Sequence, residues 1–278
     1  MAIKDVLLTL TSYPDPTPAL VVDRAVSFAS LLGAHIAAIS CEVHVQVPGS
    51  FLGGAGHLGS ILASEAHKSR SNAQDLLATF ESTAQKAGVQ RESVLERCLT
   101  HEVPDLLVEY ARLRDLTIVP VPESYDQWYA EAVIFGAGRP ALVVPETPQS
   151  RPFELNRVLV AWDFSRAAAR AVSDAIPILE KAREVRILTV TNEKAMPGRR
   201  SSSELAKNLS RHGIDVIVEE VDAAGRGIGD VLAAQIEASR ADLLVMGAYG
   251  HSRFREFILG GATRSILAKP PIPVLLSH

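Results

Sequence analysis

Residues 158–162, Val-Leu-Val-Ala-Trp, repeat the pattern of residues 6–10, Val-Leu-Leu-Thr-Leu, which lie 152 positions earlier in the chain. Residues 242–246, Asp-Leu-Leu-Val-Met, match residues 115–119, Asp-Leu-Thr-Ile-Val, at an offset of 127. Each stretch is a continuous apolar run, as expected of a strand that is buried on both faces of a parallel sheet. Two matches in the same order indicate that the chain is a degenerate tandem repeat.

Both copies end in the same way, and a proline-rich stretch separates them. Proline precedes a short apolar run at 140–144 and again at 273–276. Residues 145–152 contain three prolines and polar residues without an apolar period, which is typical of a linker. The sequence therefore predicts two domains, residues 1–146 and 153–278, each of a size that one core can organise.

Strand-like runs alternate with helical spacing of apolar residues in each half. This alternation predicts an α/β fold of two tandem open parallel five-stranded sheets, with helices on both faces and right-handed crossovers. We expect Pro177 to kink its helix, and Ser201 with Glu204 has the spacing of a capping box. The expected strands are 4–10, 35–41, 93–99, 116–121, 140–144, 157–162, 185–191, 214–221, 242–246 and 273–277, and the expected helices include 58–87, 166–182, 202–212, 229–239 and 262–269.

Composition excludes several classes of function. The net charge is −4, from 28 Lys and Arg against 32 Asp and Glu, which argues against a protein that coats nucleic acid. No apolar run approaches the roughly 20 residues of a membrane span, and residues 1–5 do not begin a signal peptide. Cys41 and Cys98 lie in apolar stretches and are expected to be reduced core residues. These features favour a cytoplasmic protein.

The charge is divided unevenly between the halves. Residues 1–146 carry 17 acidic and 10 basic side chains, whereas residues 147–278 carry 15 acidic and 18 basic ones. Because anionic ligands favour the less acidic surface, this asymmetry weakly indicates that such a ligand belongs to the second half.

The segment 247–263 follows the fourth predicted strand of the second half. Parallel sheets bind ligands at the carboxyl ends of their strands, so this segment is the place to look for a site. Gly247 and Gly250 allow the backbone a close approach, and residues 260–263, Gly-Gly-Ala-Thr, begin a helix whose amino end attracts anions. From the residues alone, a phosphate cradle and an ordinary turn with a helix cap are equally supported.

These residues resemble the universal stress protein family. Gly247-x-x-Gly250, nine residues and then Gly260 is the nucleotide-binding spacing of that family, and residues 246–253 with 259–263 resemble a bacterial tandem subgroup. The resemblance is strong over 157–278 and weaker over 1–145. It implies a five-stranded parallel α/β fold, often dimerised through the last strand, with ATP bound by some members and not by others.

The resemblance also implies roles for individual residues. Asp163 would contact the ribose or a bound Mg²⁺ ion, and Val190 and Thr191 would offer backbone groups to the adenine edge. The ribose and the phosphates would lie against Gly247, Gly250, Gly260, Gly261, Ala262 and Thr263. Gly261 departs from the family pattern, which has Ser or Thr directly after the third glycine, and the lost hydroxyl donor costs about 1 kcal/mol of binding.

The first half departs further from the pattern. Thr11 stands where the second half has Asp163, and Pro120 stands where it has Gly247. Only residues 137–139 separate Gly136 from Pro140, which leaves no room for a helix that would cradle phosphates. We interpret this half as a partner domain that binds no nucleotide.

Three weaker motifs are better explained without chemistry. Residues 225–230 miss the dinucleotide fingerprint because Asp230 replaces its last glycine. The glycine-rich run 48–56 is expected to be a loop, and His251 a surface side chain.

The leading hypothesis is a universal stress protein that binds an adenine nucleotide and acts as a sensor or signalling adaptor in the stress response. The expected ligand is ATP, or alternatively ADP or AMP, with Mg²⁺, and any ATP hydrolysis would be slow because no dedicated general base is evident. The apolar last strands are expected to pair with each other or with a second chain, and a homodimer is expected besides this internal pairing. Alternatives are an interaction protein without nucleotide and an enzyme that acts on an adenylated small molecule.

Overall fold

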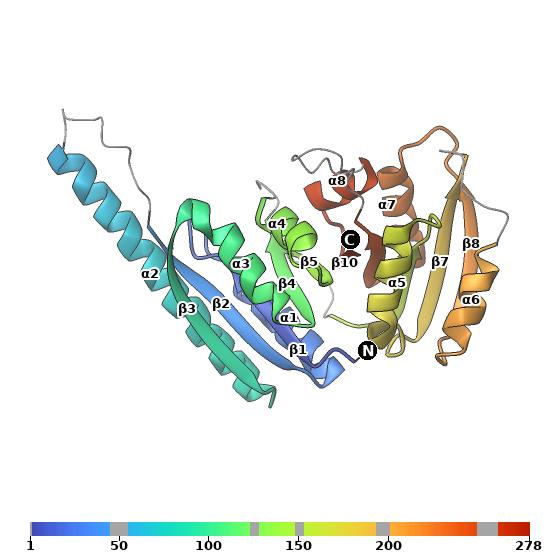
Figure 1. Ribbon diagram of the computed structural model, residues 1–278, viewed down its shortest axis with the longest axis horizontal. Coiled ribbons are helices and arrows are strands. Elements are labelled where there is room, and N and C mark those ends of the chain that lie inside the picture. Colours follow the sequence, from blue (N-terminus) through green and yellow to red (C-terminus); the bar gives the residue numbers. More distant parts are fainter. Residues whose placement is uncertain (1, 45–54, 123–127, 148–152, 193–200, 249–260) are drawn as a thin grey trace.

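The computed structural model describes residues 2–44, 55–122, 128–147, 153–192, 201–248 and 261–278. Strands and helices alternate along the whole chain, as the sequence predicts (Figure 1). In chain order the elements are β1 (Asp5–Leu10), α1 (Ala19–Leu32), β2 (His35–His44), α2 (Ala55–Lys86), β3 (Arg91–Leu99), η1 (Thr100–Glu102), α3 (Val103–Arg112), β4 (Leu116–Val121), α4 (Trp128–Gly136), β5 (Ala141–Pro145), β6 (Arg157–Ala161), α5 (Arg166–Leu179), β7 (Glu184–Thr191), α6 (Ser203–Ser210), β8 (Val216–Asp222), α7 (Ile228–Ser239), β9 (Leu243–Gly247), α8 (Gly261–Ala268) and β10 (Val274–Ser277).

All ten strands belong to one sheet, in the order β3-β2-β1-β4-β5-β10-β9-β6-β7-β8. The strands of each half pair in parallel, and the order reverses beside the first strand of each half. The chain moves outward from β1 to β2 and β3, then returns to the other side of β1 with β4, and the second half repeats this path. Each half therefore has a topological switch point, between β1 and β4 and between β6 and β9.

The two halves are joined by their last strands. β5 and β10 pair antiparallel, with Val143 opposite Val274 and Ala141 opposite Leu276, and all of these side chains are buried. Figure 1 shows both strands at the middle of the molecule. The prediction that the apolar edges pair is confirmed, and they do so within one chain, so two five-stranded sheets become one of ten.

Equivalent aspartates hold the amino ends of the first strands and confirm the repeat at the level of single hydrogen bonds. Asp115 Oδ2 accepts the backbone N–H groups of Lys4 and Asp5 at 2.8 and 3.1 Å. Asp242 Oδ2 accepts those of Asn156 and Arg157, both at 2.9 Å. The two offsets found in the sequence, 152 and 127, therefore relate residues that form equivalent hydrogen bonds in the two halves.

Helices cover both faces of the sheet. Alternate residues of each buried strand point to opposite faces, so Val6 and Leu8 pack on one face and Leu7 on the other. The first face is covered by α1, α2, α5 and α6, and the second by α3, α4, α7 and α8. Each hydrophobic cluster runs through both halves, so the joined sheet has one continuous core on each side.

The start of α6 differs from the sequence analysis. Ser201 does not form the predicted capping box: its hydroxyl accepts the N–H of Ser203, and Glu204 instead pairs with Lys207. The helix α6 begins at Ser203, one residue after the predicted start at 202, and Ser202 is its N-cap residue. Cys41 and Cys98 are free and buried, as expected.

Gly247 ends β9 where this strand meets the start of α5. A Cβ atom at this position would lie 2.5 Å from the carbonyl carbon of Ala167 and from the backbone nitrogen of Ala168. No side chain can move away to relieve that contact, because the obstacle is the backbone of the helix. Packing alone therefore requires glycine here, whatever the site binds.

We predict that Gly247→Ala lowers the free energy of unfolding by about 1–3 kcal/mol or more, because the added methyl group overpacks the β9–α5 contact. The matched variant is Gly261→Ala at the start of α8, where a Cβ atom would meet nothing within 4 Å. It should leave stability unchanged or raise it by up to about 1 kcal/mol. Urea unfolding followed by circular dichroism measures both, and equal destabilisation by the two changes would contradict the packing argument.

We also predict that a polypeptide of residues 153–278 associates in solution, because removal of β5 exposes the apolar edge of β10. Sedimentation should detect dimers of the fragment at micromolar concentration. The full chain should not associate through β10, because β5 already covers that edge. A fragment that stays folded, soluble and monomeric would show that the seam between β5 and β10 is dispensable.

Candidate functional site

The strand registers bring three of the predicted site residues to one edge of the second half. Ala161 in β6 lies beside Leu188 in β7, and Val160 lies beside Val245 in β9. Asp163, Thr191 and Gly247 each follow these paired positions by two or three residues. They therefore meet at the carboxyl edge of β9, β6 and β7, which includes the switch point of this half.

A local turn fixes the position of Asp163. Its Oδ1 atom accepts the N–H of Ser165 at 3.0 Å, and the Ser165 hydroxyl accepts the N–H of Ala168 at 3.1 Å to cap α5. Phe164 between them has a positive φ of 61°, a conformation that this turn imposes on a residue other than glycine. The half-buried carboxylate is thus held at the amino end of α5, where the helix dipole favours negative charge.

Val190 and Thr191 contribute the end of β7. The Thr191 carbonyl accepts the N–H of Ala223 at 2.9 Å, and Val190 is half-buried and packs against the core. Thr191 pairs with Asp222 of β8, which in turn accepts a hydrogen bond from Asn192 at 2.9 Å. Hydrogen bonds to β8 and to Ala223 therefore fix this end of β7 at the same edge as Asp163.

The start of α8 presents residues of different character. Gly261 is exposed and Ala262 is half-buried, whereas Thr263 is buried. The predicted roles of Gly250 and Gly260 fall on residues outside the part of the chain that the structure describes, as does His251. Within the described part, the site is the edge formed by Asp163, the end of β7, Gly247 and the first turn of α8.

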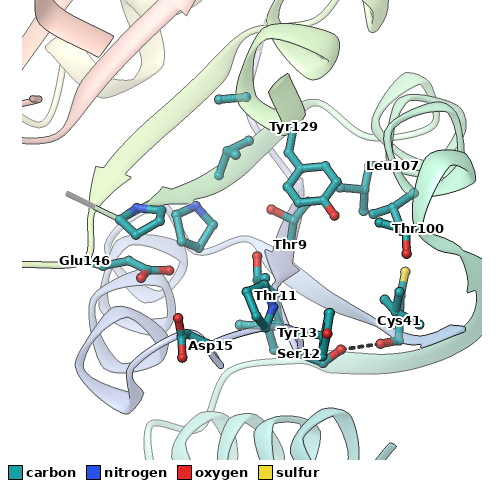
Figure 2. Close-up of a pocket in the computed structure, with 18 residues that line it drawn as sticks. Thr9, Thr11, Ser12, Tyr13, Asp15, Cys41, Thr100, Leu107, Tyr129 and Glu146 are labelled. Carbon is teal, nitrogen blue, oxygen red and sulfur yellow. Dashed lines mark hydrogen bonds between the residues drawn. The ribbon is translucent and has the colours of Figure 1, made fainter. Parts of the chain in front are cut away.

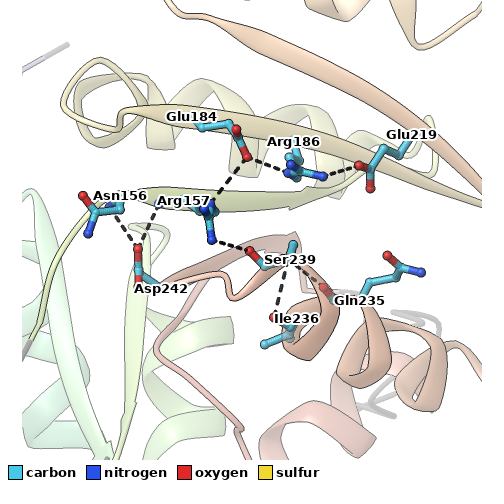
Figure 3. Close-up of polar contacts among 9 residues, drawn as sticks. All are labelled: Asn156, Arg157, Glu184, Arg186, Glu219, Gln235, Ile236, Ser239 and Asp242. Carbon is cyan, nitrogen blue, oxygen red and sulfur yellow. Dashed lines mark hydrogen bonds and ion pairs between the residues drawn. The ribbon is translucent and has the colours of Figure 1, made fainter. Parts of the chain in front are cut away.

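A polar cluster at the opposite, amino edge of this half is structural (Figure 3). Arg157 Nη1 donates to the carbonyl of Ser239 at 3.1 Å, and Arg186 pairs with Glu184 and Glu219. Every carboxylate in the figure is engaged by a cation or by a backbone N–H, so the cluster ties strand ends together. Partly exposed ion pairs of this kind contribute about 0–1 kcal/mol each to stability.

The first half has a cavity that sequence reasoning did not predict. It encloses about 400 Å³ at the carboxyl ends of β1, β2 and β4, at the switch point of this half (Figure 2). Its lining includes Thr11 and Pro120, which correspond to Asp163 and Gly247 of the second half. The interpretation of this half rested on Thr11, on Pro120 and on the short segment before Pro140, and none of these indicates whether the same edge encloses space.

The described residues contain no group of three or more His, Cys, Asp or Glu side chains placed to bind a metal ion. Within the same ranges, no helix combines the length and the apolar character that crossing a bilayer requires. Asp163 remains the candidate ligand for an ion that arrives with a nucleotide, because Mg²⁺ is typically bound by one or two carboxylates together with phosphate oxygens.

Comparison with known proteins relates the chain to one family. The sequence model of the universal stress protein family matches residues 154–278. A universal stress protein of Synechocystis is 28% identical over 219 residues, which cover 76% of this chain and 74% of that protein.

Solved structures reproduce the fold over the whole chain. A universal stress protein from Archaeoglobus fulgidus superimposes with a TM-score of 0.70 at 17% identity, covering 98% of both chains. A protein of unknown function from Pseudomonas aeruginosa gives a TM-score of 0.58 at 15% identity, covering 99% of this chain and 92% of that one. The resemblance read from the sequence is thereby confirmed for residues 154–278, which match the universal stress protein family, and the solved structures confirm the fold over the whole chain.

Proposed function

We propose that the second half binds an adenine nucleotide, ATP with Mg²⁺ or alternatively ADP or AMP, and that the protein acts as a nucleotide-dependent sensor or signalling adaptor in the cytoplasmic stress response. The division into a supporting domain, residues 1–146, and a nucleotide-binding domain, residues 153–278, is part of this proposal.

The observation that carries the proposal is the convergence of Asp163, Thr191 and Gly247 at the switch point between β6 and β9. A carboxylate there can accept hydrogen bonds from the hydroxyl groups of a ribose. Gly247 lets β9 pack directly against the start of α5, because a Cβ atom at this position would lie 2.5 Å from the helix backbone, and so it brings the end of β9 close to Asp163. We assign the adenine edge to backbone groups at the end of β7, where the Thr191 carbonyl already accepts the N–H of Ala223.

The phosphates are assigned to the start of α8. The first N–H groups of a helix lack partners within the helix, and the helix dipole adds positive potential at the same end. Gly261 is exposed there, so the backbone is accessible to an anion. Thr263 is buried and is better suited to anchoring the first turn than to reaching a ligand, which shifts the expected contacts toward backbone N–H groups.

Catalysis is not part of the proposal. Asp163 is committed to the turn that begins α5, and the geometry supplies positioning and charge stabilisation without a dedicated base. Hydrolysis of a bound ATP would therefore be slow, as suits a protein that reports nucleotide state.

The competing hypotheses predict different contents of the purified protein. Nucleotide released on denaturation, identified by absorbance and mass spectrometry, supports the binding proposal, and its absence together with no affinity for added ATP supports a pure interaction protein. Turnover of a released adenylated molecule supports the enzyme. A homodimer remains a proposal too, and one that extends the sheet would use the outer edges β3 and β8, because β5 and β10 already pair within the chain.

We predict that Asp163→Ala weakens binding of ATP with Mg²⁺ by at least about tenfold, because a ribose or metal contact worth about 1.5–3 kcal/mol is lost. Titration calorimetry measures the affinity, and urea unfolding should show a smaller effect on stability. The control is Glu237→Ala, which removes an exposed carboxylate from the last turn of α7 at the other edge of the sheet. Unchanged affinity of the Asp163 variant would remove this residue from the site.

We predict that Gly261→Ser tightens ATP binding, because it restores the hydroxyl donor that the family pattern has after the third glycine. A hydrogen bond to a charged phosphate is worth at most about 1.5–3 kcal/mol, or about 10- to 100-fold in affinity. Gly261→Ala is the matched control, since the position accepts a Cβ atom without contact and alanine adds no donor. If neither wild type nor the serine variant binds ATP, the nucleotide proposal fails.

A further inference from the structure

The cavity of the first half is built from segments that are distant in sequence. The loop after β1 forms one wall with Thr11, η1 contributes Thr100, α3 contributes Leu107, α4 contributes Tyr129, and the residue after β5 is Glu146. Figure 2 shows these side chains around a common space. At about 400 Å³ the cavity is large enough for a small organic molecule.

Polar groups lie at both ends of this cavity. Glu146 and Asp15 gather at one end, and Cys41 and Thr100 lie at the other, with Tyr129 projecting between them (Figure 2). The Thr100 hydroxyl is buried and has no hydrogen-bond partner within the part of the chain that the structure describes. An unpaired buried hydroxyl costs stability, and a bound molecule would satisfy it.

The end at Glu146 is organised by a chain of hydrogen bonds. The Thr17 hydroxyl accepts the N–H of Thr11 at 3.0 Å and hydrogen-bonds with the Glu146 side chain, so its proton is donated to that carboxyl group. The Glu146 N–H donates to the carbonyl of Val121 at 3.0 Å. These hydrogen bonds therefore hold the Glu146 carboxyl group in position at the cavity.

The cavity is unsuited to phosphate. Among the described residues, its lining contains Asp15 and Glu146 but no Lys, Arg or His. Pro120 and Pro122 replace a glycine turn and have no backbone N–H to donate to an anion. In the second half, the equivalent edge has glycine and the amino end of α8 nearby in sequence. The two switch points thus differ in the groups that they offer to a ligand.

We propose that this cavity is a second binding site of the protein, specific for a small, partly apolar organic molecule that is cationic or neutral and carries hydrogen-bond donors. An ammonium or hydroxyl group would face Glu146 and Asp15, an apolar body would lie against Leu107 and Val119, and a polar group at the far end would pair with Thr100. The site is independent of nucleotide binding in the second half.

The titratable groups of the cavity predict how binding depends on pH. Burial raises the pKa of Glu146, the hydrogen bond from Thr17 lowers it and the nearby charge of Asp15 raises it, and together these effects bring the pKa to about 7. Burial also raises the pKa of Tyr129 to about 12 and the pKa values of Tyr13 and Cys41, so these three groups stay neutral around pH 7. Glu146 gains its negative charge as the pH rises through about 7, and the affinity for a cation should rise with it.

Three isosteric probes test the proposal on the full chain: tyramine is cationic, 4-hydroxyphenylethanol is neutral, and 4-hydroxyphenylacetate is anionic. Probes of this size bind in about the millimolar range, so amide chemical shifts in a labelled sample are the suitable measurement. At about pH 8 tyramine should bind at least about tenfold more tightly than the anion, with shifts at Thr11, Thr100 and Tyr129. Its affinity should fall several-fold at about pH 6.

Two variants and one control localise the effect. Glu146→Gln should reduce the preference for the cation, since only Asp15 then remains, and should remove its pH dependence near pH 7, while the neutral probe still binds. Ala130→Leu, which places a larger side chain in the lining, should weaken all three probes, and circular dichroism checks that both variants fold. Glu237→Ala removes an exposed carboxylate from α7 in the second half and should leave the binding of all three probes unchanged. Equal binding of cation and anion, shifts confined to other residues, or no binding of any probe at about 10 mM would overturn the proposal.

Discussion

The antiparallel pairing of β5 and β10 is the contact on which the rest of the molecule depends. Each half of the chain ends in a short apolar strand whose free edge would be exposed if the half stood alone. Pairing the two edges removes both liabilities and merges two sheets into one, so that each hydrophobic cluster continues across the seam. The contact between Phe28 of α1 and Phe153, with ring centroids 5.5 Å apart, ties the halves together on one face.

The joined sheet presents the same backbone geometry twice with different chemistry. Asp115 and Asp242 keep equivalent hydrogen bonds at the amino edge, where the fold is held. At the carboxyl edge, Thr11 and Pro120 stand where the other half has Asp163 and Gly247. Parallel sheets place ligand sites at that edge, so the repeat has preserved its structural end and diverged at its binding end. The first half has Pro120 where the second has Gly247, and a cavity lies at this edge all the same.

Much of the fold could be predicted from the sequence, because buried parallel strands are continuous apolar runs and the two halves repeat each other. Strand pairing followed from the apolar character of 140–144 and 273–276. The cavity could not be predicted, since its walls come from Thr11, Thr100, Tyr129 and Glu146, and no local pattern reports how such segments close on one another. The sequence analysis explained Gly247 by ligand binding alone. The structure shows that packing also requires glycine, because a Cβ atom there would lie 2.5 Å from the backbone of α5.

The number of ATP molecules bound by one chain tests the central claim most directly, that one fold carries two chemically distinct switch points. Titration calorimetry with Mg²⁺ present should give one ATP per chain, with the single site weakened by Asp163→Ala and unaffected by Glu146→Gln. Two equivalent ATP sites, or one site that responds to the Glu146 change instead, would contradict the account.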